Sequence, residues 1–245
     1  MKIIEFNLKK IQQRLLDLQQ SAFEKKKDIS QLELLLSFKS KVLEQKYPQL
    51  LASIEEMAIE LNKEKKCASL SDTINGFLIV HKLEDDTFAK KLHELRKRDI
   101  TKPFLSVLPL GFDYKSMIKQ DGYSTQEFNF ISQYLDKYWP GRNTFIFKKN
   151  KNIKYPAGEN IALRMPSIYD NIIFCTLLHL VNQPLLAPSL NYPNQEVLTT
   201  QKEIENTFGS KLEYGLFDFN QENTQNKASN LYSFLLDKHQ LNKIR

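Results

Sequence analysis

The sequence predicts an α/β protein in which a twisted, mixed β-sheet is flanked by helices and preceded by a helical segment. Apolar residues recur at helical spacing over residues 1–46, whereas short apolar runs typical of strands follow Lys66. Strands and helices then alternate without a regular βαβ order, which favours a mixed sheet over a doubly wound parallel one. We therefore divide the chain into a helical extension, residues 1–47, and an α/β domain, residues 48–245.

Apolar spacing and capping residues define the first three helices. Two lie within residues 1–46, and Ser30 with Glu33 forms a capping-box pattern at the start of the second. Pro48 is tolerated in a first helical turn and begins the third helix. Its buried face is expected to be formed by four apolar residues: Leu51, Ile54, Ala58 and Leu61.

The remaining elements follow from short apolar runs and from helical patterns between turn signals. Thr125 is expected to cap one of these helices, and Gly209 to end another. The expected strands are Cys67–Leu70, Phe77–His81, Phe104–Leu108, Asn143–Phe147, Ile161–Arg164, Leu185–Pro188, Leu212–Phe219 and Asn230–Leu236. The expected helices are Asp86–Arg96, Thr125–Tyr138, Ile168–Leu180 and Thr199–Phe208.

Composition and charge exclude several classes of protein. With 41% hydrophobic and 26% charged residues, the 245-residue chain is neither collagen-like nor disordered. The longest apolar stretch, Ile172–Val181, is well below the ~18 residues of a membrane span, so no membrane association is expected. Residues 1–7 include Glu5 and Asn7 where a signal peptide needs an apolar core, which predicts a cytoplasmic location.

The charge and the metal-binding residue types narrow the choice of ligand. The net charge of +6 favours anionic partners without identifying one. The two cysteines and four histidines have no zinc-site spacing, so we expect no metal site. The usual phosphate-loop, dinucleotide, zinc-protease and serine-hydrolase motifs are also absent from the sequence.

Two clusters of polar residues remain as candidates for a site. Arg96, Lys97, Arg98 and Lys102 lie between a helix end and a strand start; they either offset the helix dipole as a solvated charge run or bind phosphate. Ser189 and Asn191 follow a buried strand, and in an extended chain residues i and i+2 point to the same side. The pair can therefore face one ligand, although turn chemistry explains the same residue types equally well.

Read in order, the motifs of the chain resemble the YrdC-like superfamily of threonylcarbamoyl-AMP synthases and their YciO-like relatives, over residues 51–237. Arg96 stands where that family has the lysine of its K-x-R motif, and Leu70 and Ser71 replace a Pro-Thr pair. The matching segments are Leu70–Phe77, Arg96–Asp99 with Lys102–Phe104, Trp139–Thr144, Arg164–Pro166, Ala187–Asn191 and Ala228–Leu231.

The resemblance implies a nucleotidyltransferase that joins L-threonine, bicarbonate and ATP into threonylcarbamoyl-AMP and releases pyrophosphate. The product serves the threonylcarbamoyladenosine modification of tRNA by partner proteins. Mg²⁺ is expected to arrive with ATP, and no protein-bound cofactor is expected. By the same resemblance, Arg96 and Arg98 are assigned catalytic roles. Substrate or nucleotide binding is assigned to Thr73, Thr144, Arg164, Ser189, Asn191 and Ser229.

Two other functions remain open at this stage. A YciO-like protein without synthase activity would hold a nucleotide, tRNA or double-stranded RNA on a basic concave face. An interaction protein would keep the fold but use the helices of residues 1–47 as its working surface, although amphipathic helices more often pack on the domain that they precede.

Overall fold

The structure is a computed structural model of the chain. It describes residues 1–24, 30–63, 65–70, 77–82, 86–155, 158–198, 200–218 and 229–245. Within these ranges ten strands form one sheet in the order β1-β8-β2-β3-β7-β4-β6-β5-β9-β10. The strands are β1 Lys2–Phe6, β2 Cys67–Leu70, β3 Phe77–Lys82, β4 Ser106–Val107, β5 Asn143–Lys148, β6 Asn160–Arg164, β7 Leu185–Leu186, β8 Tyr214–Asp218, β9 Asn230–Leu235 and β10 Gln240–Lys243.

The sheet is mixed, as predicted. Strands β1, β8 and β2 run parallel to one another, and so do the pairs β4 with β6 and β5 with β9. The remaining neighbours are antiparallel, including both contacts of the short strand β7. The predicted α/β class with helices beside a mixed sheet is therefore confirmed.

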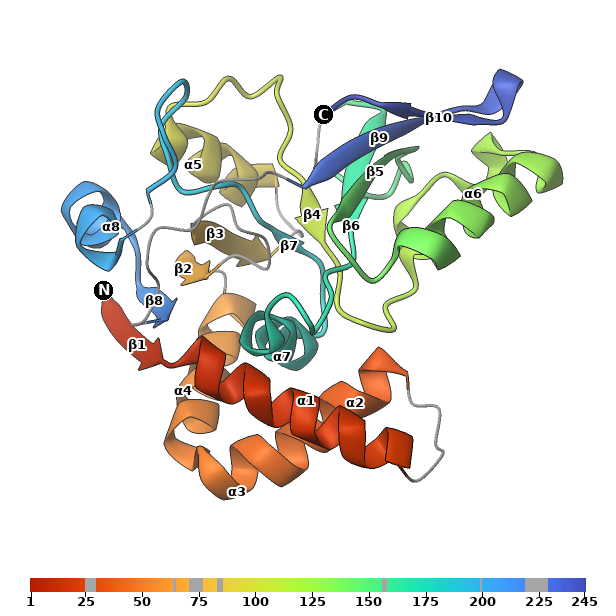
Figure 1. Cartoon of the computed structure of the whole chain (residues 1–245). Helices are drawn as coiled ribbons and strands as arrows, with labels where there is room; N and C mark the ends of the chain where they lie inside the picture. Colours follow the sequence, from red (N-terminus) through yellow and green to blue (C-terminus); the bar gives the residue numbers. More distant parts are fainter. Residues whose placement is uncertain are drawn as a thin grey trace.

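Helices pack on the sheet in two groups. Below the strands in Figure 1, α1, α2 and α4 gather around the buried helix α7, whereas α6 lies beside β5 and β6. The helices are α1 Leu8–Glu24, α2 Gln31–Phe38, α3 Glu44–Lys46, α4 Pro48–Asn62, α5 Asp86–Arg96, α6 Thr125–Tyr138, α7 Ile172–Val181 and α8 Gln201–Phe208. A π-helical turn, Lys39–Leu43, joins α2 to α3.

The first residues of the chain belong to the sheet, which the sequence reading did not anticipate. It assigned only helices to residues 1–46, but Lys2–Phe6 forms the parallel edge strand β1 beside β8. The five residues are too short a run for a clear alternating pattern, and their partner lies near the other end of the chain. Ile4 on β1 and Leu15 on α1 are buried in the same core as the helix α7.

Several element ends differ from the predicted ones because capping side chains decide them. Ser124, not Thr125, caps α6, and its side chain and that of Glu127 form a capping box. Asn171 caps α7, so this helix begins at Ile172 and not at Ile168. The capping box of Ser30 with Glu33 and the start of α4 at Pro48 are confirmed.

Two predicted strands are shorter than expected, and one further strand was not predicted. Phe104–Leu108 contains only the two residues of β4, and Leu185–Pro188 only the two of β7. Proline has no N–H group for a ladder and limits such runs. The strand β10 was not predicted, because Gln240–Lys243 is polar at an exposed sheet edge.

The end of α5 places two arginine side chains on either side of a tight turn. Lys97 adopts the left-handed conformation with φ 51°. The backbone N–H groups of Lys97 and Arg98 donate to the carbonyl oxygens of Glu94 and His93 at 3.0 and 2.9 Å. This is the Schellman motif that commonly ends helices. Arg96 is the last residue of α5, and Arg98 follows the left-handed Lys97, so the two arginines stand on either side of the turn.

Two adjacent leucines test whether α1 is part of the core. Leu15 is 0% exposed and Leu16 is 44% exposed. We expect Leu15→Ala to lower the free energy of unfolding by ~2–5 kcal/mol, because it leaves a cavity. Leu16→Ala should change it by no more than ~0.5 kcal/mol. Urea denaturation measures both, and equal values would show that α1 does not pack as described.

Lys97 offers a second test of local geometry. A left-handed conformation costs a residue with a side chain ~1–2 kcal/mol, and glycine avoids this cost. Glycine loses more conformational freedom on folding, however, which offsets ~0.5–1 kcal/mol of the gain. Lys97→Gly should therefore raise the free energy of unfolding by ~0.5–1 kcal/mol. Lys97→Ala keeps the strained geometry and is the matched control for loss of the side chain. The turn is assigned wrongly if the glycine variant is no more stable than the alanine variant.

Candidate functional site

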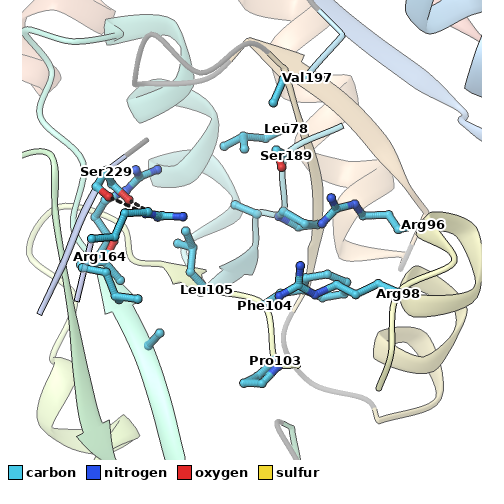
Figure 2. A pocket seen from close by; sticks show the side chains of 16 residues that line it. Leu78, Arg96, Arg98, Pro103, Phe104, Leu105, Arg164, Ser189, Val197 and Ser229 are labelled. Carbon is cyan, nitrogen blue, oxygen red and sulfur yellow. Dashed lines mark hydrogen bonds between the residues drawn. The ribbon is translucent and has the colours of Figure 1, made fainter. Parts of the chain in front are cut away.

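A cavity of about 410 Å³ opens where the short central strands end. Its walls come from segments that are far apart in the sequence, and Figure 2 shows Arg96 and Arg98 on one side of it and Arg164 with Ser229 on the other. Among the residues that the structure describes, no carboxylate lines it. The lining residues are Leu78, Arg96, Arg98, Pro103, Phe104, Leu105, Thr144, Ala162, Arg164, Ala187, Pro188, Ser189, Val197, Ser229, Leu231 and Arg245.

Asn191 holds the guanidinium group of Arg96. The Nε and Nη2 atoms of Arg96 donate to the backbone oxygen and the Oδ1 of Asn191 at 3.0 and 2.6 Å. The hydroxyl of Ser189 donates to the same Oδ1 at 2.9 Å, and the amide nitrogen of Asn191 donates to the carbonyl of Gln195. Two fixed acceptors hold the plane of the Arg96 side chain, which is 4% exposed.

The Ser189–Asn191 segment differs from its expected geometry. Extended chain would direct both side chains to one ligand, but the N–H of Asn191 donates to the carbonyl of Ser189 at 3.2 Å, so the segment turns. Ser189 lines the cavity, and Asn191 stands behind Arg96 without lining it. Ser189 and Asn191 nevertheless contact each other, through the hydrogen bond from the Ser189 hydroxyl to the Asn191 Oδ1.

Arg164 and Arg245 form the second pair of cations. Arg164 is the last residue of β6 and is 2% exposed. The Nε of Arg245 donates to the carbonyl of Ser229 at 3.2 Å, and its Nη2 lies 3.5 Å from the Ser229 hydroxyl. That hydroxyl also lies 3.1 Å from the hydroxyl of Thr144, which ties the start of β9 to β5.

Burial and a neighbouring positive charge act together on Arg96 and on Arg245. Burial lowers the pKa of Arg96 to about 10, and the positive charge of Arg98 contributes. Burial also lowers the pKa of Arg245, and the charge of Arg164 lowers it further. With a pKa of about 10, Arg96 still carries its charge at neutral pH. An anion in the cavity would relieve the repulsion within both pairs and form charge-assisted hydrogen bonds.

The turn before β5 is built around a glycine and a tryptophan. A Cβ on Gly141 would lie 2.8 Å from the carbonyl oxygen of Tyr138, so a side chain does not fit there. The N–H of Gly141 donates to the carbonyl of Met165 at 2.8 Å, and the Trp139 Nε1 donates to the carbonyl of Asn143 at 2.7 Å. These bonds place Thr144 at the cavity, next to the end of β6.

The structure thus brings most of the predicted site residues to one place. Six of the eight line the cavity, and Asn191 supports one of the six, Arg96. Thr73 and the rest of its motif lie outside the described residues. The residues that line the cavity as a set are Arg96, Arg98, Thr144, Arg164, Ser189 and Ser229.

Sequence reasoning missed Arg245. The sequence reading ended the last strand at Leu236 and gave no role to the residues beyond it. The β9–β10 hairpin turns back at Lys238 and His239, and the carbonyl of Leu231 then accepts from the N–H groups of Ile244 and Arg245. The polar sequence of β10, Gln240–Lys243, gives no signal for this return.

Two features concern membranes and metals. None of the helices in the described part of the chain is long and apolar enough to cross a bilayer. Over the same residues, no three His, Cys, Asp or Glu side chains gather in a group that could hold a metal ion.

Solved structures share this fold. P. abyssi Sua5 complexed with L-threonine is similar with a TM-score of 0.64 and 18% identity over 75% of this chain and 51% of that one. E. coli YciO is similar with a TM-score of 0.63 and 18% identity over 80% and 89%. Full-length HypF in a phosphate- and nucleotide-bound form is similar with a TM-score of 0.58 and 19% identity over 74% and 27%.

The chain spans about half of the length of the Sua5 chain that it matches. No curated protein matches it in sequence. A family model described as telomere recombination, Sua5_yciO_yrdC, matches residues 70–236, which is more than half of the chain. This confirms the resemblance read from the motifs: the protein belongs to the Sua5/YciO/YrdC family.

Proposed function

We propose that the protein is a synthase of threonylcarbamoyl-AMP, acting on ATP, L-threonine and bicarbonate in its arginine-lined cavity. One observation carries the proposal: four arginines face a single cavity, with no carboxylate among its described lining residues. A polyphosphate is the substrate group that fits such a charge distribution. The structure of Sua5 with L-threonine and that of HypF with phosphate and nucleotide support small-molecule binding by this fold.

The proposed reaction has two bond-forming steps. The amine of threonine takes up bicarbonate to give a carbamate and water. A carbamate oxygen then attacks the α-phosphorus of ATP, and the bond to the β-phosphate oxygen breaks to release pyrophosphate. Negative charge builds up on the phosphoryl oxygens and on the leaving group, so fixed cations and positioning supply most of the catalysis.

Each side of the cavity has a part in this proposal. Arg96 and Arg98 bind the phosphate oxygens from one side and stabilise the charge of the leaving pyrophosphate. Arg164 and Arg245 bind from the other side, with the hydroxyl groups of Thr144, Ser189 and Ser229 as further hydrogen-bonding groups. Mg²⁺ carried by the triphosphate would offset part of the negative charge on its oxygens. The modification of tRNA by partner proteins would consume the product.

A second candidate is a YciO-like protein that holds a nucleotide or RNA without synthase activity. Its supporting observation is length, because the alignment covers 80% of this chain and 89% of E. coli YciO. Binding of RNA through the basic cavity would weaken steeply as salt concentration rises.

The reaction itself is the first test. We expect purified protein with ATP, L-threonine, bicarbonate and Mg²⁺ to form pyrophosphate and an AMP adduct that both require threonine. Chromatography detects the adduct, and a phosphate assay detects pyrophosphate. Omission of threonine or bicarbonate is the control. Folded protein that binds ATP but forms neither product would favour the YciO-like alternative.

The arginine geometry gives a second test. Arg98→Ala should weaken ATP binding by about ten- to a hundredfold, because a charge-assisted hydrogen bond contributes ~1.5–3 kcal/mol. The neighbouring Lys97 is exposed, and its Nζ lies over the ring of Tyr192 at 5.1 Å, away from the cavity lining. Lys97→Ala should therefore change the affinity less than twofold. Calorimetric titration with ATP measures both, and equal losses would contradict the assigned site.

A further inference from the structure

Phe104 lines the cavity, and both Arg96 and Arg98 lie over its ring. The guanidinium carbons of Arg96 and Arg98 lie 5.5 and 5.4 Å from the centre of its ring. Arginine is favourable over an aromatic face at such distances, and the more so when water is excluded. The positions of both cations therefore depend on where the ring of Phe104 is held.

A buried pair of polar side chains holds that ring. His93 stacks on Phe104 with a centroid distance of 4.2 Å and an interplanar angle of 24°. The hydroxyl of Tyr155 accepts a hydrogen bond from the backbone N–H of Phe104 at 2.8 Å and lies 3.1 Å from the Nε2 of His93. His93 and Tyr155 are both 3% exposed. They come from α5 and from the connection between β5 and β6, so the unit joins three separate segments.

The hydrogen bonds define the tautomer of His93. Its Nδ1 lies 3.3 Å from the carbonyl oxygen of Arg98, which can only accept, so Nδ1 carries the proton. Nε2 is then the acceptor for the hydroxyl proton of Tyr155, while the oxygen of that hydroxyl accepts from Phe104. Burial lowers the pKa of His93, and the charges of Arg98 and Arg96 lower it further, which keeps the ring neutral.

The hydrogen bonds of His93 reach the turn that carries Arg96 and Arg98. His93 contacts Arg98 twice: its carbonyl accepts the N–H of Arg98, and its Nδ1 donates to the carbonyl of Arg98. The Nε of Arg98 in turn donates to the carbonyl of Lys102 at 3.0 Å, two residues before Phe104. The loop from Arg98 to Phe104 is thus closed at both ends by His93 and Tyr155.

We propose that His93 and Tyr155 are positioning residues, which hold Phe104 and the loop before it so that Arg96 and Arg98 face the cavity. The identity of the anion that these arginines bind rests on the proposed function, but their positioning does not. Neither residue lines the cavity, so neither is expected to touch a substrate.

Tyr155→Phe in the full chain tests the proposal, because it removes one hydroxyl and leaves the ring. Nuclear magnetic resonance reports the exchange protection of the Nε protons of Arg96 and Arg98 and the ¹⁵N shifts of the His93 ring. We expect a neutral Nδ1–H ring in the wild type. The variant should lose about tenfold of the Arg98 protection and bind inorganic pyrophosphate about tenfold more weakly in calorimetry.

Tyr214→Phe is the matched control. Its hydroxyl also donates one hydrogen bond, to Glu56 at 2.9 Å, but from β8 and outside the lining of the cavity. This variant should keep the wild-type arginine signals and pyrophosphate affinity, even if it lowers the melting temperature as much as Tyr155→Phe does. A general loss of stability is thereby separated from a loss of positioning.

Two variants of His93 provide the rescue test. His93→Leu should lose the protection of Arg98, whereas His93→Asn keeps a donor near the Nδ1 position and should restore part of it. The proposal is overturned if folded Tyr155→Phe and His93→Leu both retain wild-type arginine protection, or if the His93 ring is protonated at Nε2 only. If wild-type protein binds no pyrophosphate while the variants still lose arginine protection, the positioning role stands and the proposed function fails.

Discussion

Repulsion between four like charges around one cavity is the constraint on which the rest of the structure depends. Arg96 lies near Arg98, and Arg164 lies near Arg245; Arg96 and Arg164 are buried, and no carboxylate is found among the described lining residues. Bringing like charges together at a partly buried site is costly, so such an arrangement depends on other groups that hold the side chains. Under the proposed function, the phosphate groups of ATP supply the counter-charge.

Neutral groups hold three of these four cations. The amide oxygen of Asn191 and the carbonyl oxygens of Asn191, Lys102 and Ser229 accept from three of the four arginines. The ring of Phe104 supports the first pair from the cavity wall. Dipoles and aromatic faces fix a guanidinium without cancelling its charge, whereas a carboxylate would fix it and also remove its attraction for a ligand.

Much of the fold and part of the candidate site could be predicted from local patterns in the sequence. Caps such as Ser30 and the start of α4 at Pro48 depend on neighbouring residues and could be predicted. The motif residues Arg98, Arg164 and Ser189 could be identified as one site because a family shares their order. Arg245 could not, because only the return of the β9–β10 hairpin brings it to Ser229. Tyr155 meets His93 across 62 positions of sequence, which no periodicity reports.

The pairing of β1 with β8 also sets an order of events during synthesis. Lys2 lies opposite Tyr214, so β1 has no partner strand until β8, far along the sequence, has been made. During that interval an apolar strand edge and the buried face of α1 are exposed to other chains. Assembly of the sheet should therefore be slow and finish late, and nascent chains of this protein should depend on chaperones more than a protein with local pairing does.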